Sequence, residues 1–257
     1  MSTPIKITFL GTGTSSGVPM IGCDCEVCTS ANKKDKRLRS SILIQSYTTT
    51  IVIDTTPDFR YQMLRTATKH IDAVVFTHPH KDHIGGLDDI KAFNFFSQKP
   101  MPLYLNELTL SGVEKEMHYA FVEHKYPGVP SFEIHLIDNE KFVIGDIEIE
   151  PINVWHFKMP VLGFRIGDFT YITDANRIDE VELNKILGSK ILVLNALRKK
   201  VHISHFTLQE AVDLGNQLQL PKIYLTHISH QMGLHDAINK ELPNHIELAF
   251  DGLVLDL

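Results

Sequence analysis

Residues 77 to 83, with the sequence Thr-His-Pro-His-Lys-Asp-His, constrain this chain more than any other segment. They place three imidazoles and a carboxylate (His78, His80, Asp82 and His83) directly after an apolar run. Such crowding is of little use to an ordinary surface or core, but neutral imidazole and ionised carboxylate are good donors to divalent metal ions. The alternating pair can face one ion and the adjacent pair another. The segment therefore predicts a metal centre at a strand end, rather than a solvated polar loop.

The composition is that of an ordinary globular protein. Of the 257 residues, 43% are hydrophobic and 22% are charged, and a chain of this length can bury a sizeable core as one domain covering 1–257. No apolar run approaches the roughly 18 to 20 residues needed to cross a bilayer. The N-terminal residues lack the pattern of a secretory signal, so the expected location is cytoplasmic, with no membrane partner.

The net charge of −6 argues against a protein that grips long nucleic acid, because neutralising many phosphates requires clustered Lys and Arg. It does not argue against a small phosphate-bearing substrate. Bound divalent cations would reverse the sign of the local field inside a cleft.

All three cysteines, Cys23, Cys25 and Cys28, lie within six residues. An odd number at such close spacing is a poor disulfide framework. Three thiolates and one outside ligand would complete a tetrahedral structural zinc site. Redox-active thiols and incidental cysteines are the alternatives.

Strand-like runs alternate with helix signals along the chain. The runs cover 5–10, 41–46, 50–54, 73–76, 103–106, 132–136, 147–152, 162–166, 170–173, 191–194 and 222–225. Thr56 followed by Pro57 predicts a helix start leading into 58–66, and Thr207 with Glu210 predicts a capping box. A third helix, over 181–187, is expected to end at Gly188. The pattern predicts an α/β (α+β) fold in which helices cover mixed sheets.

Four further residues could complete the metal sites. His156, Asp174 and His227 each follow an apolar run, and His230 lies three residues after His227. Taken singly, each has an ordinary explanation, since an aspartate at a strand end is usually a turn residue and a lone histidine is usually part of the core. Ligands gathered at the ends of distant strands are nevertheless how α/β enzymes assemble a site.

The order of these residues resembles the five-motif signature of the metallo-β-lactamase superfamily of binuclear hydrolases. The Gly11–Thr14 turn, the Cys23–Cys28 segment and the Leu225–Gln231 stretch are similar to the phosphoribosyl 1,2-cyclic phosphate phosphodiesterase (PhnP-like) family. The similarity runs from Gly11 to Gly252. It implies a four-layer αββα sandwich with the metal site at one edge between the two sheets, and it suggests a homodimer.

The resemblance also implies a ligand set, carried over position by position. One active-site ion, zinc, manganese or iron, would be held by His78, His80 and His156, and a second by Asp82, His83 and His227, with Asp174 as the bridge. A structural zinc would be held by Cys23, Cys25, Cys28 and His230.

Other residues match positions around the family's active site. Asp54 resembles the aspartate that hydrogen-bonds the histidine loop and fixes its ring orientation. His205 aligns with the histidine that contacts phosphate or protonates the leaving group, with His202 as the competing residue, and Asp82 would also orient the attacking water. Arg198 is a weaker prediction for substrate contact.

The expected activity is hydrolysis of small, possibly cyclic, phosphodiesters. A thioester or lactam hydrolase, a tRNA 3′-end nuclease and a non-catalytic metal-stabilised binding module are the alternatives. The sequence departs from the family over 195–198 and 93–102, which are therefore expected to line the substrate pocket. The reaction class consequently transfers better than the natural substrate.

Overall fold

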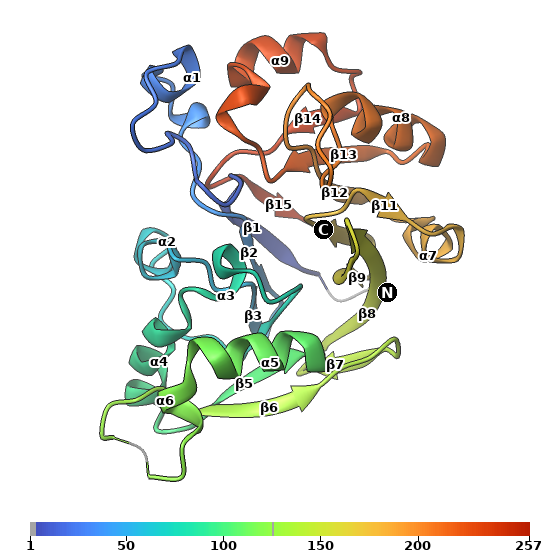
Figure 1. Ribbon diagram of the computed structural model, residues 1–257. Helices are drawn as coiled ribbons and strands as arrows, with labels where there is room; N and C mark the ends of the chain where they lie inside the picture. Colours follow the sequence, from blue (N-terminus) through green and yellow to red (C-terminus); the bar gives the residue numbers. More distant parts are fainter. Residues whose placement is uncertain (1–3, 125) are drawn as a thin grey trace.

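The computed structural model describes residues 4–124 and 126–257, which form two β-sheets packed face to face with helices on the outer surfaces (Figure 1). In spatial order the first sheet contains β15 (Val254–Asp256), β1 (Lys6–Gly11), β2 (Ser41–Gln45), β3 (Thr50–Ile53), β4 (Ala73–Val75), β5 (Met101–Leu105) and β6 (Phe132–Leu136). The second contains β11 (Arg177–Ile178), β8 (Ile147–His156), β9 (Met159–Ile166), β10 (Phe169–Ile172), β12 (Ile191–Asn195), β13 (Lys222–Thr226) and β14 (Ile246–Leu248), with β7 (Phe142–Ile144) paired to β8. All eleven predicted strands are present.

The strands of both sheets are apolar on both faces. Because successive side chains of a strand point to opposite sides, neighbouring residues enter different cores. In β2, Ile42 and Ile44 enter the core between the sheets, whereas Leu43 packs beneath the outer helices. In β12, Val193 faces the other sheet and its neighbour Leu194 faces the helices. One core therefore lies between the two sheets, and one lies between each sheet and its helices. This is the predicted four-layer αββα sandwich.

Two groups of helices form the outer layers. The first sheet is covered by α2 (Phe59–Arg65), α3 (Lys81–Ile84), η2 (Leu87–Ile90), α4 (Lys91–Ser97), α5 (Glu107–Glu116) and α6 (His118–Phe121). The second is covered by α7 (Glu180–Ile186), α8 (Leu208–Leu218) and α9 (His235–Glu241). The short helices α1 (Glu26–Thr29), η1 (Lys33–Asp35) and η3 (His230–Met232) lie in connecting segments.

The predicted helix signals differ in accuracy. Thr207 and Glu210 form the expected capping box at the start of α8. The expected start at Thr56 and Pro57 is early by two residues, because residues 56–58 form a turn and the helix begins at Phe59. Thr56 still contributes, since its hydroxyl accepts a hydrogen bond from the Asp58 amide at 3.1 Å.

Strand direction positions the polar residues. In the first sheet β3 and β4 run parallel, and in the second β10, β12 and β13 run parallel. The carboxyl ends of parallel strands lie at one edge of a sheet, and loops there carry functional groups in α/β proteins. The residues that follow these five strands therefore meet at a common edge of the sandwich.

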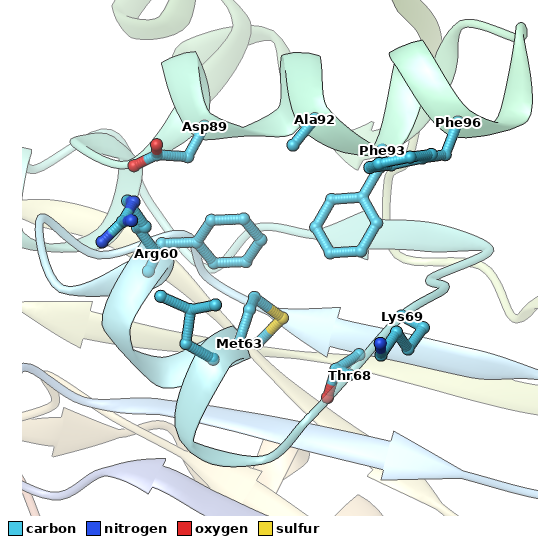
Figure 2. Close-up of a pocket in the computed structure, with 10 residues that line it drawn as sticks. Arg60, Met63, Thr68, Lys69, Asp89, Ala92, Phe93 and Phe96 are labelled. Atoms are coloured by element: carbon cyan, nitrogen blue, oxygen red, sulfur yellow. The ribbon is translucent and has the colours of Figure 1, made fainter.

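The segment 93–102 does not line this edge, which corrects the expectation for it. It forms part of α4 in the outer layer and the start of β5 in the first sheet, and Phe93 and Phe96 of α4 line an apolar cavity of about 550 Å³. Figure 2 shows Met63 of α2 and Phe93 of α4 facing each other across this cavity. Across the described ranges, no helix combines the length and apolar character required to span a bilayer.

Candidate metal centre

Three polar residues end their strands in an unusual backbone conformation. Asp54 after β3, Asp174 after β10 and His227 after β13 have φ values of 66°, 56° and 55°. Residues with a Cβ rarely adopt the left-handed region, and each such residue costs on the order of 1–3 kcal/mol. Here the conformation turns each buried side chain inward from its strand end. Strain of this kind clusters at functional sites.

Asp54 sets the histidine loop in place. Its carboxylate is fully buried and accepts hydrogen bonds from the Thr77 amide at 2.9 Å, the Thr77 hydroxyl at 2.8 Å and Nδ1 of His83 at 2.7 Å. Because the Thr77 hydroxyl gives its proton to Asp54, its oxygen accepts from Nδ1 of His78, 2.9 Å away. One carboxylate thereby fixes the tautomers of His78 and His83, leaving both Nε2 lone pairs for the centre.

One group of donors surrounds Asp174. The ligand atoms of Asp82, His83, Asp174 and His227 all lie within 4.8 Å of one another. Nε2 of His83 is 2.5 Å from Oδ2 of Asp174, and Nδ1 of His227 is 2.9 Å from Oδ1. Both nitrogens are buried, and neither has a hydrogen-bond partner with acceptable geometry among the described residues. Buried polar atoms without partners are costly, so this donor set fits a divalent cation.

A second group of imidazoles adjoins Asp174 through His78, which contacts the same carboxylate oxygen as His83. Nε2 of His78 is 3.3 Å from Oδ2 of Asp174 and 3.1 Å from Nδ1 of His80. The His156 ring centroid is 5.0 Å from that of His80, and its Nδ1 donates to the Ser204 carbonyl at 2.8 Å. Its Nε2 is therefore unprotonated when the ring is neutral. Asp174 is therefore contacted by His78 of this group and by His83 and His227 of the first group.

Electrostatics at the centre favour bound cations. Burial acts to raise the pKa values of Asp82 and Asp174, yet the neighbouring histidines hold both well below their usual range. Burial acts to lower the pKa of His83, but the surrounding carboxylates raise it well above the ordinary value, so an ion bound there would have to displace a proton from this ring. Burial also lowers the pKa of His156 to about 4, which keeps that ring neutral. Ionised carboxylates and neutral imidazoles are the forms that bind metal.

The two competing histidines lie at different distances from the centre. Nε2 of His205 is 3.1 Å from Oδ1 of Asp174, and its ring stacks on His227 with centroids 5.0 Å apart. His202 contacts His205, Nδ1 to Nδ1, at 3.1 Å and belongs to the layer behind it. Only His205 of this pair reaches the carboxylate that the donor sets share.

The residues of the segment 195–198 bind the protein itself. The Asn195 side-chain amide is buried and pairs with both backbone groups of Ala175. The Arg198 guanidinium binds Oε1 of Gln231 at 2.6 Å and the carbonyls of Lys200 and Val201. The expectation that this segment lines the substrate pocket is therefore wrong for Asn195, and the contacts of Arg198 support a structural role.

The cysteine segment meets His230 beside this centre. Sγ of Cys23 and Sγ of Cys25 each lie 3.3 Å from Nδ1 of His230, and the four ligand atoms of the Cys3His set lie within 4.8 Å of one another. The hydrogen bond from His230 lowers the pKa of Cys25 to about 6, and burial raises that of Cys28 to about 11. The donor set is that of a structural zinc site.

The Gly11–Thr14 turn connects the two centres. Thr12 and Thr14 exchange backbone hydrogen bonds with Ile228 at 2.9 and 3.1 Å, directly after His227. Gly13 is required there, because a Cβ would lie 2.9 Å from the Arg37 carbonyl oxygen. The cysteine segment therefore lies against the end of the strand that supplies His227.

Sequence reasoning did not identify a hollow on the exposed side of the centre. About 490 Å³ in volume, it is lined in part by His80, His156, Phe157 and Ile203. Phe157 and Ile203 are exposed apolar residues in a turn and a loop, where no periodic pattern marks them.

Comparison with known proteins gives a consistent result. Residues 49–228 match the model described as "Beta-lactamase superfamily domain". The crystal structure of a "New Diphosphatase from the PhnP Family" is 40% identical and superposes with a TM-score of 0.94, covering 100% of this chain and 98% of that one. An "Octanoyltransferase" from Porphyromonas gingivalis is 36% identical over 97% of this chain, which spans only about half (51%) of that relative's length. An "Exodeoxyribonuclease WalJ" from Streptococcus pneumoniae is 26% identical, and the match covers 72% of this chain and 74% of the length of that relative.

Proposed function

Because this chain belongs to the PhnP family of the metallo-β-lactamase superfamily of hydrolases, we propose that it is a binuclear metal-dependent phosphodiesterase acting on small substrates. One observation carries the proposal. The buried Asp174 carboxylate is contacted by four imidazoles, those of His78, His83, His205 and His227, at 2.5 to 3.3 Å. A carboxylate placed in this way can bridge two cations.

The proposed ligands follow from the two donor groups. One ion would be held by His78, His80 and His156, the other by Asp82, His83 and His227, and Asp174 would be shared. Divalent ions bound there would supply Lewis-acid chemistry, polarising a phosphoryl oxygen and lowering the pKa of water. The structural zinc would be held by the Cys3His set.

Three residues of the chain would perform the remaining steps. Asp54 keeps the ligand rings oriented through its bonds to Thr77 and His83. Asp82, ionised at neutral pH, can accept a hydrogen bond from the attacking water and orient it. His205 lies beside the shared carboxylate and can protonate the departing alkoxide or contact the phosphate.

The phosphorus chemistry has support from the relatives. The diphosphatase and the exodeoxyribonuclease are both named for cleavage at phosphorus. The octanoyltransferase name belongs to a protein about twice as long, so we do not transfer that activity. The net charge of −6 favours a small phosphodiester over a long nucleic acid as substrate.

The test compares substrate classes on protein loaded with zinc or with manganese. Bis(p-nitrophenyl) phosphate should be hydrolysed, whereas S-lactoylglutathione (a thioester) and nitrocefin (a lactam) should remain intact. Hydrolysis of either of those two, with the phosphodiester left untouched, would overturn the proposal in favour of an acyl hydrolase.

A further inference from the structure

Helix α4 in the outer layer carries aromatic side chains that the core does not use. Its sequence is Lys-Ala-Phe-Asn-Phe-Phe-Ser, yet it buries none of its residues. It lies beside α2, because the rings of Phe59 and Phe93 have their centroids 6.2 Å apart. Phe96 on α4 is 82% exposed and Leu64 on α2 is 60% exposed. Large apolar side chains gathered at one exposed place mark a binding surface or a ligand groove.

The cavity of about 550 Å³ lies between these two helices, and we call it the α2–α4 cavity (Figure 2). The buried side chains of Phe59 and Met63 close its inner side, and the exposed Leu64 and Phe96 border its opening. Its volume falls within the range of small-molecule sites. Because apolar walls gain free energy when they are removed from water, the cavity favours an apolar ligand.

Charged groups lie at the two ends of the α2–α4 cavity. Figure 2 shows Arg60 beside Asp89 at one end, and Lys69 beside Thr68 at the other. Within the ranges 4–124 and 126–257, Lys69 forms no salt bridge with a carboxylate. The lining holds two cations against one carboxylate, although the whole chain has a net charge of −6. An ammonium and a hydroxyl at one end of an apolar cavity can both donate hydrogen bonds to an anionic group.

We propose that the α2–α4 cavity binds a fatty acid anion, with the alkyl chain between the two helices and the carboxylate at Lys69 and Thr68. The positive charge is confined to the ends of the cavity, which suits a ligand with a single anionic head. A partner helix with acidic flanks would require cations along the whole groove. The cavity shares no lining residue with the Asp174 donor set, so the inference does not depend on the proposed phosphodiesterase activity.

A series of saturated carboxylates, from hexanoate to tetradecanoate, tests the apolar part of the site. Each is titrated calorimetrically into the metal-loaded protein below its critical micelle concentration. Affinity should rise up to about fourfold with each added CH2 group and then level off once the cavity is full, at one ligand per chain. Dodecylamine has the chain of dodecanoate with a cationic head, and it should bind at least tenfold more weakly than dodecanoate.

Two exposed positions allow the site to be changed without disturbing the core. Ala92→Leu places a larger apolar side chain in the cavity and should weaken dodecanoate binding at least tenfold. Ser97→Leu adds the same side chain to α4 outside the cavity and is its matched control. Lys69→Gln should remove the preference for dodecanoate over dodecylamine, and Lys115→Gln, on α5, should retain it. Thermal unfolding checks that all four variants are folded.

The remaining outcomes overturn the proposal. Absence of dodecanoate binding does so, as does binding that Ala92→Leu and Lys69→Gln both leave unchanged. If the protein sediments with phosphatidylglycerol vesicles but does not bind monomeric carboxylates, the face is a membrane contact instead. If light scattering shows a dimer that Ala92→Leu dissociates and no carboxylate binds, the face is an interface between copies of the chain.

Discussion

Asp54→Asn should weaken both active-site ions at once, although Asp54 is not itself a proposed ligand. The carboxylate sets the tautomers of His83 directly and of His78 through the Thr77 hydroxyl. An asparagine can keep the bond from the Thr77 amide, but its NH2 group then faces the other two partners. The asparagine NH2 group donates hydrogen bonds to the Thr77 hydroxyl and to Nδ1 of His83. The ring protons of His78 and His83 therefore move to the Nε2 atoms that face the centre.

The magnitude follows from what each ring loses. A changed partner behind a ligating histidine typically costs 10- to 100-fold in metal affinity, or about 1.4–2.7 kcal/mol. An unsatisfied buried donor costs about 1–3 kcal/mol if the tautomer does not switch. Because His78 and His83 belong to different donor groups, we expect a loss of at least tenfold for each ion. Asparagine also tolerates the φ of 66° at this position, so backbone strain does not confound the comparison.

The assay is competition for zinc with a chromophoric chelator, joined to thermal unfolding with and without metal. Asp72→Asn is the matched control. Asp72 also accepts a backbone hydrogen bond, from the Thr50 amide at 2.7 Å, but it precedes β4 and so lies at the opposite end of β3 and β4 from the donors. The control should lose some stability and keep its metal affinity. If Asp54→Asn binds both ions as tightly as wild type, Asp54 is only a turn residue and the tautomer argument is wrong.

Three further outcomes are expected. His205→Ala should lower kcat by about 10²- to 10⁴-fold with active-site metal content unchanged by elemental analysis, and loss of an ion would make His205 a ligand instead. Cys25→Ala should lower the melting temperature and remove one zinc per chain, because its thiol lies 3.3 Å from His230; unchanged zinc content would contradict the Cys3His site. Burial lowers the pKa of His235 to about 4 from 6.5, so the unfolded state binds the extra proton first and the metal-free protein should lose up to about 3 kcal/mol between pH 6.5 and 4. Urea unfolding at each pH should show that the free energy of unfolding falls less steeply with decreasing pH in His235→Asn than in the wild type. Equal slopes would refute the role of His235 in this pH dependence.

The sequence predicted mixed sheets covered by helices because apolar runs alternate with helix signals, and the resemblance to the family supplied the four layers. Strands that are buried on both faces appear in the sequence as continuous apolar runs. The pattern of Ile42, Leu43 and Ile44 is an example, with odd and even positions filling different cores. Short strands such as β11, β14 and β15 carry too few residues to show a period. The helix after Pro57 begins later than predicted because the Thr56 hydroxyl caps a preceding turn.

The donor residues were recognisable because metal binding requires particular side chains in a particular order. Residues that position those donors carry no such signature. Asn176, for example, accepts a hydrogen bond at 2.7 Å from the amide of Phe157, the residue after His156, and only the tertiary structure reveals this contact. The segment 93–102 was assigned to the substrate pocket because it departed from the family, yet it forms part of α4 in the outer layer and the start of β5, away from the metal donors.

The positions of the donors along the chain determine when either centre can close during synthesis. The histidine loop leaves the ribosome early, and His227 and His230 follow about 140 residues later, which takes on the order of ten seconds at ordinary translation rates. β1 waits still longer for its partner β15 at the last residues. A nascent chain consequently carries imidazoles and thiols in incomplete sets, and a product truncated before β13 retains the histidine loop without either finished centre.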